Sequence, residues 1–236
     1  MEHFLLKLSG EALANGTQEP YDPEYLDHLC EVLKSLSEEG KQIAIVLGGG
    51  NYWRGRTYET TKLDRAVSDH IGMLATVMNA LLVSNALNAK ISDPNKKSCV
   101  MTRVKMDRIA EEYQQTKALS YLQQGRIVFL AGGTGSPFFT TDTGAALSAA
   151  ELHLPYILKG TLVNGVYDKD PKVYPDAKFL EHITYEDFVQ KKLQVMDTTA
   201  ATLCESKGIK VKFFDLQDPE NILRIAHDEP LGSTLG

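Results

Sequence analysis

Two lysines and an arginine stand beside glycine-rich turns at the ends of apolar runs, a pattern that suits phosphate binding. Lys7 lies in FLLKLS and is followed by a serine and a glycine, and Lys159 lies in YILKGTLV. Arg54 follows the consecutive glycines of GGGNYWRG at 48–55. Glycine lets backbone N–H groups approach an anion, and lysine adds a compact positive charge. For each segment alone, an ordinary turn or a surface loop is an equal or better interpretation.

A loop of unusual composition, GGTGSPFFTTDT at 132–143, separates the apolar run RIVFLA from the helix-forming run GAALSAAEL. Its threonine hydroxyls and glycine N–H groups can hold a phosphate or a sugar. Phe138 and Phe139 can stack on a base, although for the rings alone packing into the core is the simpler expectation. Asp142 stands near the start of the next helix, where it can cap that helix, order a lysine or hold magnesium.

The segment NGVYDKDP at 164–171 follows the run that contains Lys159. Asn-Gly is a strong hairpin signal, so this sequence predicts that the chain turns back at this point. Tyr167 can cover a purine, and the carboxylate of Asp170 can accept hydrogen bonds from sugar hydroxyls. An ordinary hairpin explains the same residues.

A long helix is predicted from Asp64 to about Asn88, with an apolar stripe along one side. Asp69, Gly72 and Thr76 lie three and four residues apart, so they share one face of this helix. Such a polar patch can admit a ligand, and a helix crossing with a solvated aspartate explains it equally well. The stripe consists of Val67, Ile71, Leu74, Met78 and Leu81.

Predicted strands and helices alternate along the whole chain. This order predicts a parallel-rich sheet covered by helices on both faces, in which ligands bind beyond the carboxyl ends of the strands. We find no linker, repeat or low-complexity segment, so we expect one domain over 1–236. The predicted helices are Asp22–Gly40, Asp64–Asn88, MDRIAEEYQQTKALSYLQQG up to Gly125, GAALSAAEL, one after Thr184, one from Asp197 to Gly208, and NILRIAHDE.

The composition narrows the class of protein. The net charge of −6 disfavours a general nucleic-acid binder, and three scattered cysteines with no CxxC spacing indicate a reducing compartment. No apolar run approaches membrane-spanning length, and Lys7 interrupts the first apolar run too early for a signal peptide. We therefore expect a cytoplasmic globular protein that binds neither membrane nor nucleic acid.

Taken together, the lysines, the arginine and the glycine turns predict an anion site at one end of the sheet. Neither the dinucleotide fingerprint nor the P-loop motif is present, and no Ser-His-Asp or Cys-His arrangement is evident. Phosphoryl transfer fits such a site, because it requires positioning and charge stabilisation more than covalent chemistry.

These motifs closely resemble those of the bacterial uridylate (UMP) kinases of the amino acid kinase superfamily, over almost the whole chain. Acetylglutamate and carbamate kinases share the lysines and glycines but not GTGxPFFTTDT. The resemblance is carried by KLSGEAL at 7–13, GGGNYWRG at 48–55, DHIGMLAT at 69–76, GGTGSPFFTTDT at 132–143, LKGT at 158–161, NGVYDKDP at 164–171 and MDTTA at 196–200.

The resemblance implies a three-layer α/β/α sandwich with a mainly parallel sheet, and reversible phosphoryl transfer from ATP to UMP in CTP and UTP biosynthesis. It implies magnesium held mainly by nucleotide phosphates rather than by protein ligands, a homohexamer, and UTP as an inhibitor. The N-terminal part would make acceptor and oligomer contacts, and about 150–236 would bind ATP.

The resemblance also implies roles for individual residues. Lys7 and Lys159 would neutralise the transferring phosphoryl group, and Asp142 would hold the two lysines. The ATP site would comprise Lys7, Leu8, Ser9, Gly10, Gly50, Arg54, Thr161, Tyr167 and Asp170. The UMP site would comprise Gly49, Asp69, Gly72, Thr76, Thr134, Gly135, Ser136, Pro137, Phe138, Phe139, Thr140 and Thr141.

Some positions depart from the family pattern. Ser136 replaces a usual asparagine, Leu162 and Asn164 replace a usual lysine and aspartate, and 111–118 lacks the arginines often found there, so we do not carry GTP activation over. The alternatives are a non-catalytic protein that binds UTP, UMP or an oxometalate, and a kinase of the same fold for a carboxylate, carbamate or isoprenoid phosphate. PFFTT favours UMP over those acceptors, and an intact pair of lysines with Asp142 favours a catalyst.

Overall fold

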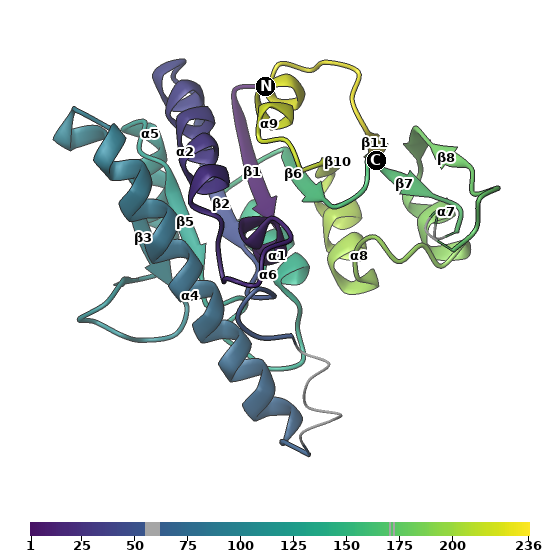
Figure 1. Ribbon diagram of the computed structural model, residues 1–236, viewed down its shortest axis with the longest axis horizontal. Helices are drawn as coiled ribbons and strands as arrows, with labels where there is room; N and C mark the ends of the chain where they lie inside the picture. Colours follow the sequence, from purple (N-terminus) through teal and green to yellow (C-terminus); the bar gives the residue numbers. More distant parts are fainter. Residues whose placement is uncertain (55–61, 170, 172) are drawn as a thin grey trace.

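A mainly parallel sheet forms the middle layer of the computed structural model (Figure 1), which describes residues 1–54, 62–169, 171 and 173–236. The strand order is β4-β3-β5-β2-β1-β6-β10-β11-β9, and within it β11 pairs antiparallel with β10. A separate small sheet pairs β7 with β8. The strands are β1 His3–Leu8, β2 Gln42–Leu47, β3 Cys99–Thr102, β4 Glu111–Glu112, β5 Val128–Ala131, β6 Tyr156–Thr161, β7 Val166–Tyr167, β8 Phe179–Leu180, β9 His182–Ile183, β10 Lys210–Asp215 and β11 Ser233–Leu235.

Helices cover both faces of the sheet and enclose two hydrophobic cores (Figure 1). The core on one face joins α2, α4 and α9 to the sheet, and the core on the other face joins α5, α6, α7 and α8. This arrangement confirms the predicted three-layer α/β/α fold. The helices are α1 Gly10–Ala14, α2 Pro23–Glu38, α4 Arg65–Lys90, the 3-10 turn η1 Pro94–Lys96, α5 Gln115–Gln123, α6 Thr141–Glu151, α7 Tyr185–Gln190, α8 Thr198–Lys207 and α9 Glu220–Ala226.

The side-chain alternation of β1 decides where its lysine points. Phe4 and Leu6 belong to the core beneath α2, and Leu5 belongs to the opposite core. Side chains two residues apart share a face of a strand, so Lys7 lies on the face of Leu5, toward α6. Parallel pairing of β1 with β6 places Lys7 directly beside Lys159.

The predicted helix ends follow ordinary capping chemistry. The carboxylates of Asp22 and Asp64 accept hydrogen bonds from backbone N–H groups in the first turns of α2 and α4. The side chains of Thr184 and Asp197 do the same for α7 and α8, and Gly208 ends α8 with a φ of 64°. A side-chain oxygen at the residue just before a helix accepts a hydrogen bond from an N–H group of the first turn, which has no partner within the helix.

Two predicted elements are wrong. The helix that ends before Gly125 begins at Gln115, because the residues before it form turns and the edge strand β4, which pairs with β3. The predicted hairpin at Asn164-Gly165 does not form, since β6 is already paired on both sides, by β1 and β10. The Val166 N–H donates to the Ser233 hydroxyl instead, and β7 pairs with β8.

The apolar stripe on α4 lies on the outer side of that helix. Val67, Leu74 and Met78 are each 47% exposed, whereas Val77 and Val83 are buried in the core. By length and composition alone, α4 is the one helix in the described part of the chain that could cross a membrane. Core helices share that composition, and α4 packs beside α2 along the sheet (Figure 1).

Candidate active site

A buried cluster of Lys7, Asp142 and Lys159 lies where β1 and β6 end and α6 begins. The Lys7 Nζ lies 2.9 Å from Asp142 Oδ1, and the Lys159 Nζ forms an ion pair with Asp142 Oδ2. The three side chains are 11%, 13% and 8% exposed, in that order. The predicted convergence of these residues is therefore present in the structure. Asp142 does not cap α6, because the Thr140 hydroxyl accepts the N–H hydrogen bonds there.

The environment of the cluster shifts two of its pKa values. Burial would raise the pKa of the Asp142 carboxyl, but the charges of Lys7 and Lys159 outweigh it and lower this pKa to about 2. Burial and the neighbouring Lys7 charge lower the pKa of Lys159 to about 8, although Asp142 opposes the shift. At neutral pH the cluster therefore holds one carboxylate against two ammonium groups, an excess positive charge that favours a bound anion.

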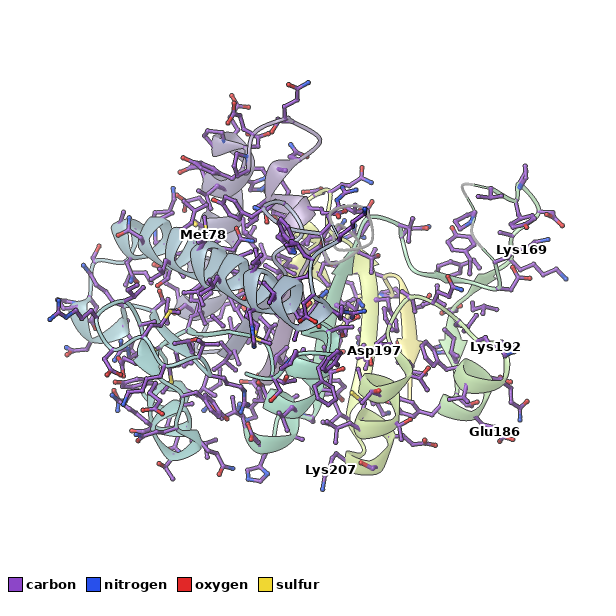
Figure 2. The ribbon with its side chains drawn as sticks, turned by 90° about the horizontal axis from the view of Figure 1, so that it is seen from below. Met78, Lys169, Glu186, Lys192, Asp197 and Lys207 are labelled. Atoms are coloured by element: carbon purple, nitrogen blue, oxygen red, sulfur yellow. The ribbon has the colours of Figure 1, made fainter. Side chains whose placement is uncertain are left out.

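Asp197 supports this cluster from the start of α8 (Figure 2). Its carboxylate accepts a hydrogen bond from the Thr140 hydroxyl and lies 3.1 Å from the Thr143 hydroxyl oxygen. These contacts tie the first turn of α6, which carries Asp142, to α8. The sequence identified Asp197 only as a helix cap, because its contacts with Thr140 and Thr143 span more than fifty residues.

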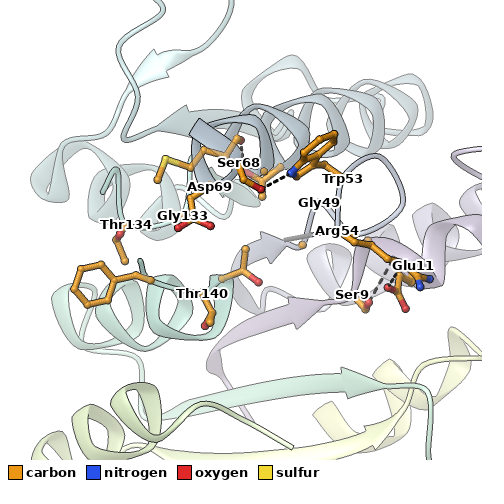
Figure 3. A pocket seen from close by; sticks show the side chains of 18 of the residues that line it. Ser9, Glu11, Gly49, Trp53, Arg54, Ser68, Asp69, Gly133, Thr134 and Thr140 are labelled. Atoms are coloured by element: carbon orange, nitrogen blue, oxygen red, sulfur yellow. Dashed lines mark hydrogen bonds and ion pairs between the residues drawn. The ribbon is translucent and has the colours of Figure 1, made fainter. Parts of the chain in front are cut away.

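A cavity of about 550 Å³ has Lys7 in its lining. Thr134 and Thr140 stand at one end of it, and Ser9 and Arg54 stand at the other (Figure 3). The described lining therefore joins residues expected for both nucleotides. From the expected ATP site it contains Lys7, Ser9, Gly10, Gly50 and Arg54, and from the expected UMP site Gly49, Asp69, Gly72, Thr76, Thr134, Phe139, Thr140 and Thr141.

The loop after β5 is held open toward solvent rather than folded into the core. Phe138 and Phe139 are 65% and 49% exposed, so the expectation that these rings pack inward is wrong. Phe138 has a φ of 72°, and its N–H donates to Asp69 Oδ2 at 2.8 Å, which fixes this part of the loop against α4. The Thr134 hydroxyl oxygen lies 3.2 Å from the donating Ser136 N–H. Phe139 lines the cavity, while 135–138 continue the loop beyond it.

Several polar residues at the cavity were missed by the sequence analysis. The Trp53 indole N–H donates to the Ser68 hydroxyl at 3.0 Å, closing one wall of the cavity. Arg54 lies 3.1 Å from the Glu11 carboxylate, and Arg65 contacts Asp69 at 3.1 Å. Charged pairs one turn apart on a helix, such as Arg65 with Asp69, are common on surfaces, so their spacing gives no functional signal.

Two further cavities continue from the cluster on the side away from α4. One, of about 610 Å³, is lined by Thr140, Asp142 and Asp197, and it shares Thr140 with the first cavity. The next, of about 520 Å³, contains Tyr167 and shares Lys192 and its two following residues with the second. The three spaces therefore follow one another, with Asp142 between the first and the third.

Thr161 and Leu8, which also belong to the expected ATP site, do not line these cavities. The Thr161 hydroxyl contacts the carbonyl oxygens of Val163 and Phe214, and so fixes the end of β6 to β10. The Leu8 side chain packs in the core beneath α2. Asp170 falls outside the described residues.

Comparisons with known proteins identify relatives over the whole chain. Residues 3–215 match the model of the amino acid kinase family. A uridylate kinase of Arabidopsis thaliana named PUMPKIN, chloroplastic, is 43% identical over 233 residues, which cover 98% of this chain and 68% of that protein. The UMP kinase structure from Bacillus anthracis has a TM-score of 0.94 at 34% identity, covering 100% of this chain and 96% of that one. The UMP kinase from Ureaplasma parvum has a TM-score of 0.92 at 33% identity, covering 100% and 98%. This chain belongs to the amino acid kinase family.

Proposed function

We propose that this chain is a UMP kinase, which transfers the γ-phosphoryl group of ATP to UMP and releases ADP and UDP. The observation that carries the proposal is the buried Lys7–Asp142–Lys159 cluster, which lies between the first cavity and the other two. Such a cluster suits a reaction in which negative charge builds up on a transferring group, because its ammonium groups are in place before the reaction. The relatives named uridylate and UMP kinase support UMP as the acceptor.

The first cavity is the better site for UMP. Gly49 and Gly50 of its triglycine loop offer backbone N–H groups to a phosphate, and Asp69 and Thr134 offer hydrogen-bonding groups to a sugar or base. The acceptor needs no protein base. A phosphate monoester has its second pKa near about 6, so it is mostly a dianion at neutral pH and is already nucleophilic.

ATP fits the second and third cavities, with its phosphates toward Lys159. The third cavity presents the rings of Tyr167 and Tyr174 to a purine. Gly10, Gly50 and Arg54, which resemblance assigns to ATP, line the first cavity instead. They would then act where the phosphates of the two nucleotides meet. This arrangement also supports the division into an N-terminal acceptor part and an ATP-binding part at about 150–236.

Magnesium is expected on the nucleotide rather than in a protein site. In the described part of the chain, no group of three or more His, Cys, Asp or Glu residues is placed to hold a metal ion. The Asp142 oxygens face two lysines, and the Asp197 oxygens face two threonine hydroxyls, so neither carboxylate is free for a metal. Bound to the ATP phosphates, magnesium would neutralise charge that the lysines do not reach.

The outer face of α4 supports self-association. Val67, Leu74 and Met78 are about half exposed on one side of this helix (Met78 is labelled in Figure 2). Monomeric proteins seldom expose large contiguous apolar patches, and a second copy of α4 would cover this one by two-fold symmetry. From the family resemblance we also propose that the chain forms a homohexamer, that UTP inhibits it and that it is cytoplasmic.

A coupled ADP-release assay with ATP and magnesium tests the proposal by comparing UMP, CMP, dUMP, GMP and no acceptor. Turnover with UMP far above the other acceptors is the expected result. If folded protein forms no ADP in response to UMP, the proposal is wrong. Calorimetry with UMP and UTP would then test the alternative, a nucleotide-binding protein without turnover.

A further inference from the structure

One face of α4 contacts the backbone of both glycine loops at the first cavity. The Thr76 hydroxyl oxygen accepts a hydrogen bond from the Gly132 N–H at 2.9 Å, at the start of the loop after β5. The Asn79 side-chain amide donates to the Gly48 carbonyl oxygen at 2.7 Å, at the start of the triglycine loop. Positions three apart on a helix lie on the same face. Two neighbouring polar side chains of one helix therefore hold the first residue of each loop.

Asn79 is a fully buried polar residue, with 0% exposure. Besides Gly48, its amide nitrogen donates to Asn51 Oδ1 at 2.8 Å, and its Oδ1 accepts from the Asn51 amide at 3.0 Å. The Asn51 amide also donates to the Pro20 carbonyl oxygen. The orientation of the Asn79 amide follows from the Gly48 carbonyl, which can only accept a hydrogen bond.

The Gly48 carbonyl lies at a crowded junction. The Gly48 N–H donates to the Leu8 carbonyl oxygen at 2.9 Å, which continues the pairing of β1 with β2 past the end of the strands. A Cβ on Gly10 would lie 2.5 Å from the Gly48 oxygen, and a Cβ on Gly49 would lie 2.9 Å from the Gly72 oxygen on α4. Because the triglycine loop touches both the Lys7–Gly10 turn and α4, a shift of Gly48 would move the backbone that faces the cluster.

We propose that Asn79 is a positioning residue for phosphoryl transfer. Its amide fixes the Gly48 carbonyl, and thereby holds the triglycine loop in register with the turn that carries Lys7. Thr76 positions the loop after β5 in the same way, because its hydroxyl accepts the hydrogen bond from the Gly132 N–H. The kinetic part of this inference rests on the UMP kinase activity proposed above, whereas the part about loop placement does not.

The test replaces each contact by a side chain of similar size that cannot make it. Asn79→Leu removes the contact to Gly48, and Thr76→Val removes the contact to Gly132. Asn88→Leu is the matched control, because Asn88 lies on the same helix and also bonds a backbone, that of Ser98, at 3.2 and 2.7 Å. Amide hydrogen exchange would be measured by mass spectrometry for peptides covering 48–54 and 132–140, and steady-state kinetics would be measured with ATP and UMP.

We expect Asn79→Leu to raise exchange by about tenfold or more at 48–54 but not at 132–140, and Thr76→Val to do the reverse. We expect Asn79→Leu to lower kcat by about tenfold to hundredfold, since a displacement near 1 Å has effects of that size. Because the triglycine loop also faces the proposed UMP site, the KM of this variant for UMP should rise, but by a smaller factor than kcat falls, whereas Thr76→Val should mainly raise that KM. If Asn79→Leu does not fold, Asn79→Asp removes the donor to Gly48 while keeping an acceptor for Asn51.

The results distinguish a failure of the Asn79 inference from a failure of the proposed function. Exchange and kinetics of the Asn79 variants that match those of Asn88→Leu would overturn the inference. Equal loosening of both loops would also overturn it, because it would indicate a general loss of stability. A wild-type protein with no UMP-dependent turnover would refute the proposed function, and the exchange pattern would still decide whether Asn79 places the loop.

Discussion

Asp142→Asn tests whether the carboxylate keeps Lys159 charged. At an effective dielectric constant of about 20, unit charges 2.9 Å apart, the separation of Lys7 Nζ and Asp142 Oδ1, attract by about 6 kcal/mol. Removing one partner of a buried pair usually costs about 3–5 kcal/mol. The variant would leave two ammonium groups facing each other without a counter-charge. One pKa unit corresponds to about 1.36 kcal/mol, so a third of this cost of about 3–5 kcal/mol would lower the pKa of Lys159 by about one unit.

The consequence is visible in a pH profile. The pKa of Lys159 is about 8 in the intact cluster, so wild-type kcat/KM should fall as the pH rises through that value. In Asp142→Asn this alkaline limb should move to lower pH by about one unit. At neutral pH, activity should fall by about 100- to 1000-fold, the loss typical when one charge-stabilising group is removed from a transition state.

Two other carboxylates give graded controls for this prediction. Asp197→Asn should shift the limb in the same direction but less, because Asp197 is the weakest of the influences that raise the pKa of Lys159. Asp187→Asn, which removes a surface charge paired with Lys191, should leave the profile unchanged. An alkaline limb at the wild-type pH in folded Asp142→Asn, with kcat/KM within threefold, would refute the reasoning.

Four further outcomes follow from the same structure. Lys7→Ala and Lys159→Ala should each lower kcat by about 100-fold or more, and near-normal turnover from folded Lys159→Ala would contradict the two-lysine scheme. Leu74→Asp combined with Met78→Asp should reduce the mass measured by light scattering, and an unchanged mass would mean that this face of α4 is not an interface. The pKa of Asp142 is lowered from 3.8 to about 2, so its ionised carboxylate should add about 2 kcal/mol to the free energy of unfolding. This stabilisation should be complete above pH 3.8 and be lost as the pH falls through 2. Urea unfolding of wild type and Asp142→Asn as a function of pH would measure it. Chelation of magnesium should abolish ADP formation, and tight magnesium binding to the nucleotide-free protein by calorimetry would contradict a metal held by phosphates.

The sequence predicted the fold well, because the order of strands and helices depends on local signals. Alternating strands and helices specify a parallel-rich sheet, and a lysine at the end of each of two strands specifies where charge accumulates. The pairing of Lys7 with Lys159 could not be derived from either segment, since it is a matter of register between strands about 150 residues apart. Recognition of the family pattern supplied that step.

The failures concern contacts between distant segments. Asn164-Gly165 has the composition of a hairpin turn, but β6 has no free edge for a returning strand. Phe138 and Phe139 are large and apolar, but the contact from Phe138 to Asp69 on α4 holds this loop at the surface. Composition cannot distinguish an aromatic ring that packs in a core from one that lines a cavity.

The electrostatics of the cluster also limit which acceptors it can serve. A carboxylate whose pKa is lowered to about 2 and whose oxygens both face lysines is a poor general base, so Asp142 cannot deprotonate an alcohol or an amine efficiently. The same lysines stabilise added negative charge. The site therefore suits an acceptor that arrives already anionic, and a nucleoside monophosphate, with a second pKa near about 6, meets that requirement at neutral pH. If the proposed function holds, the loop at 132–143 should decide which anionic acceptor binds, while the Lys7–Asp142–Lys159 cluster should stabilise the charge of the transferring group.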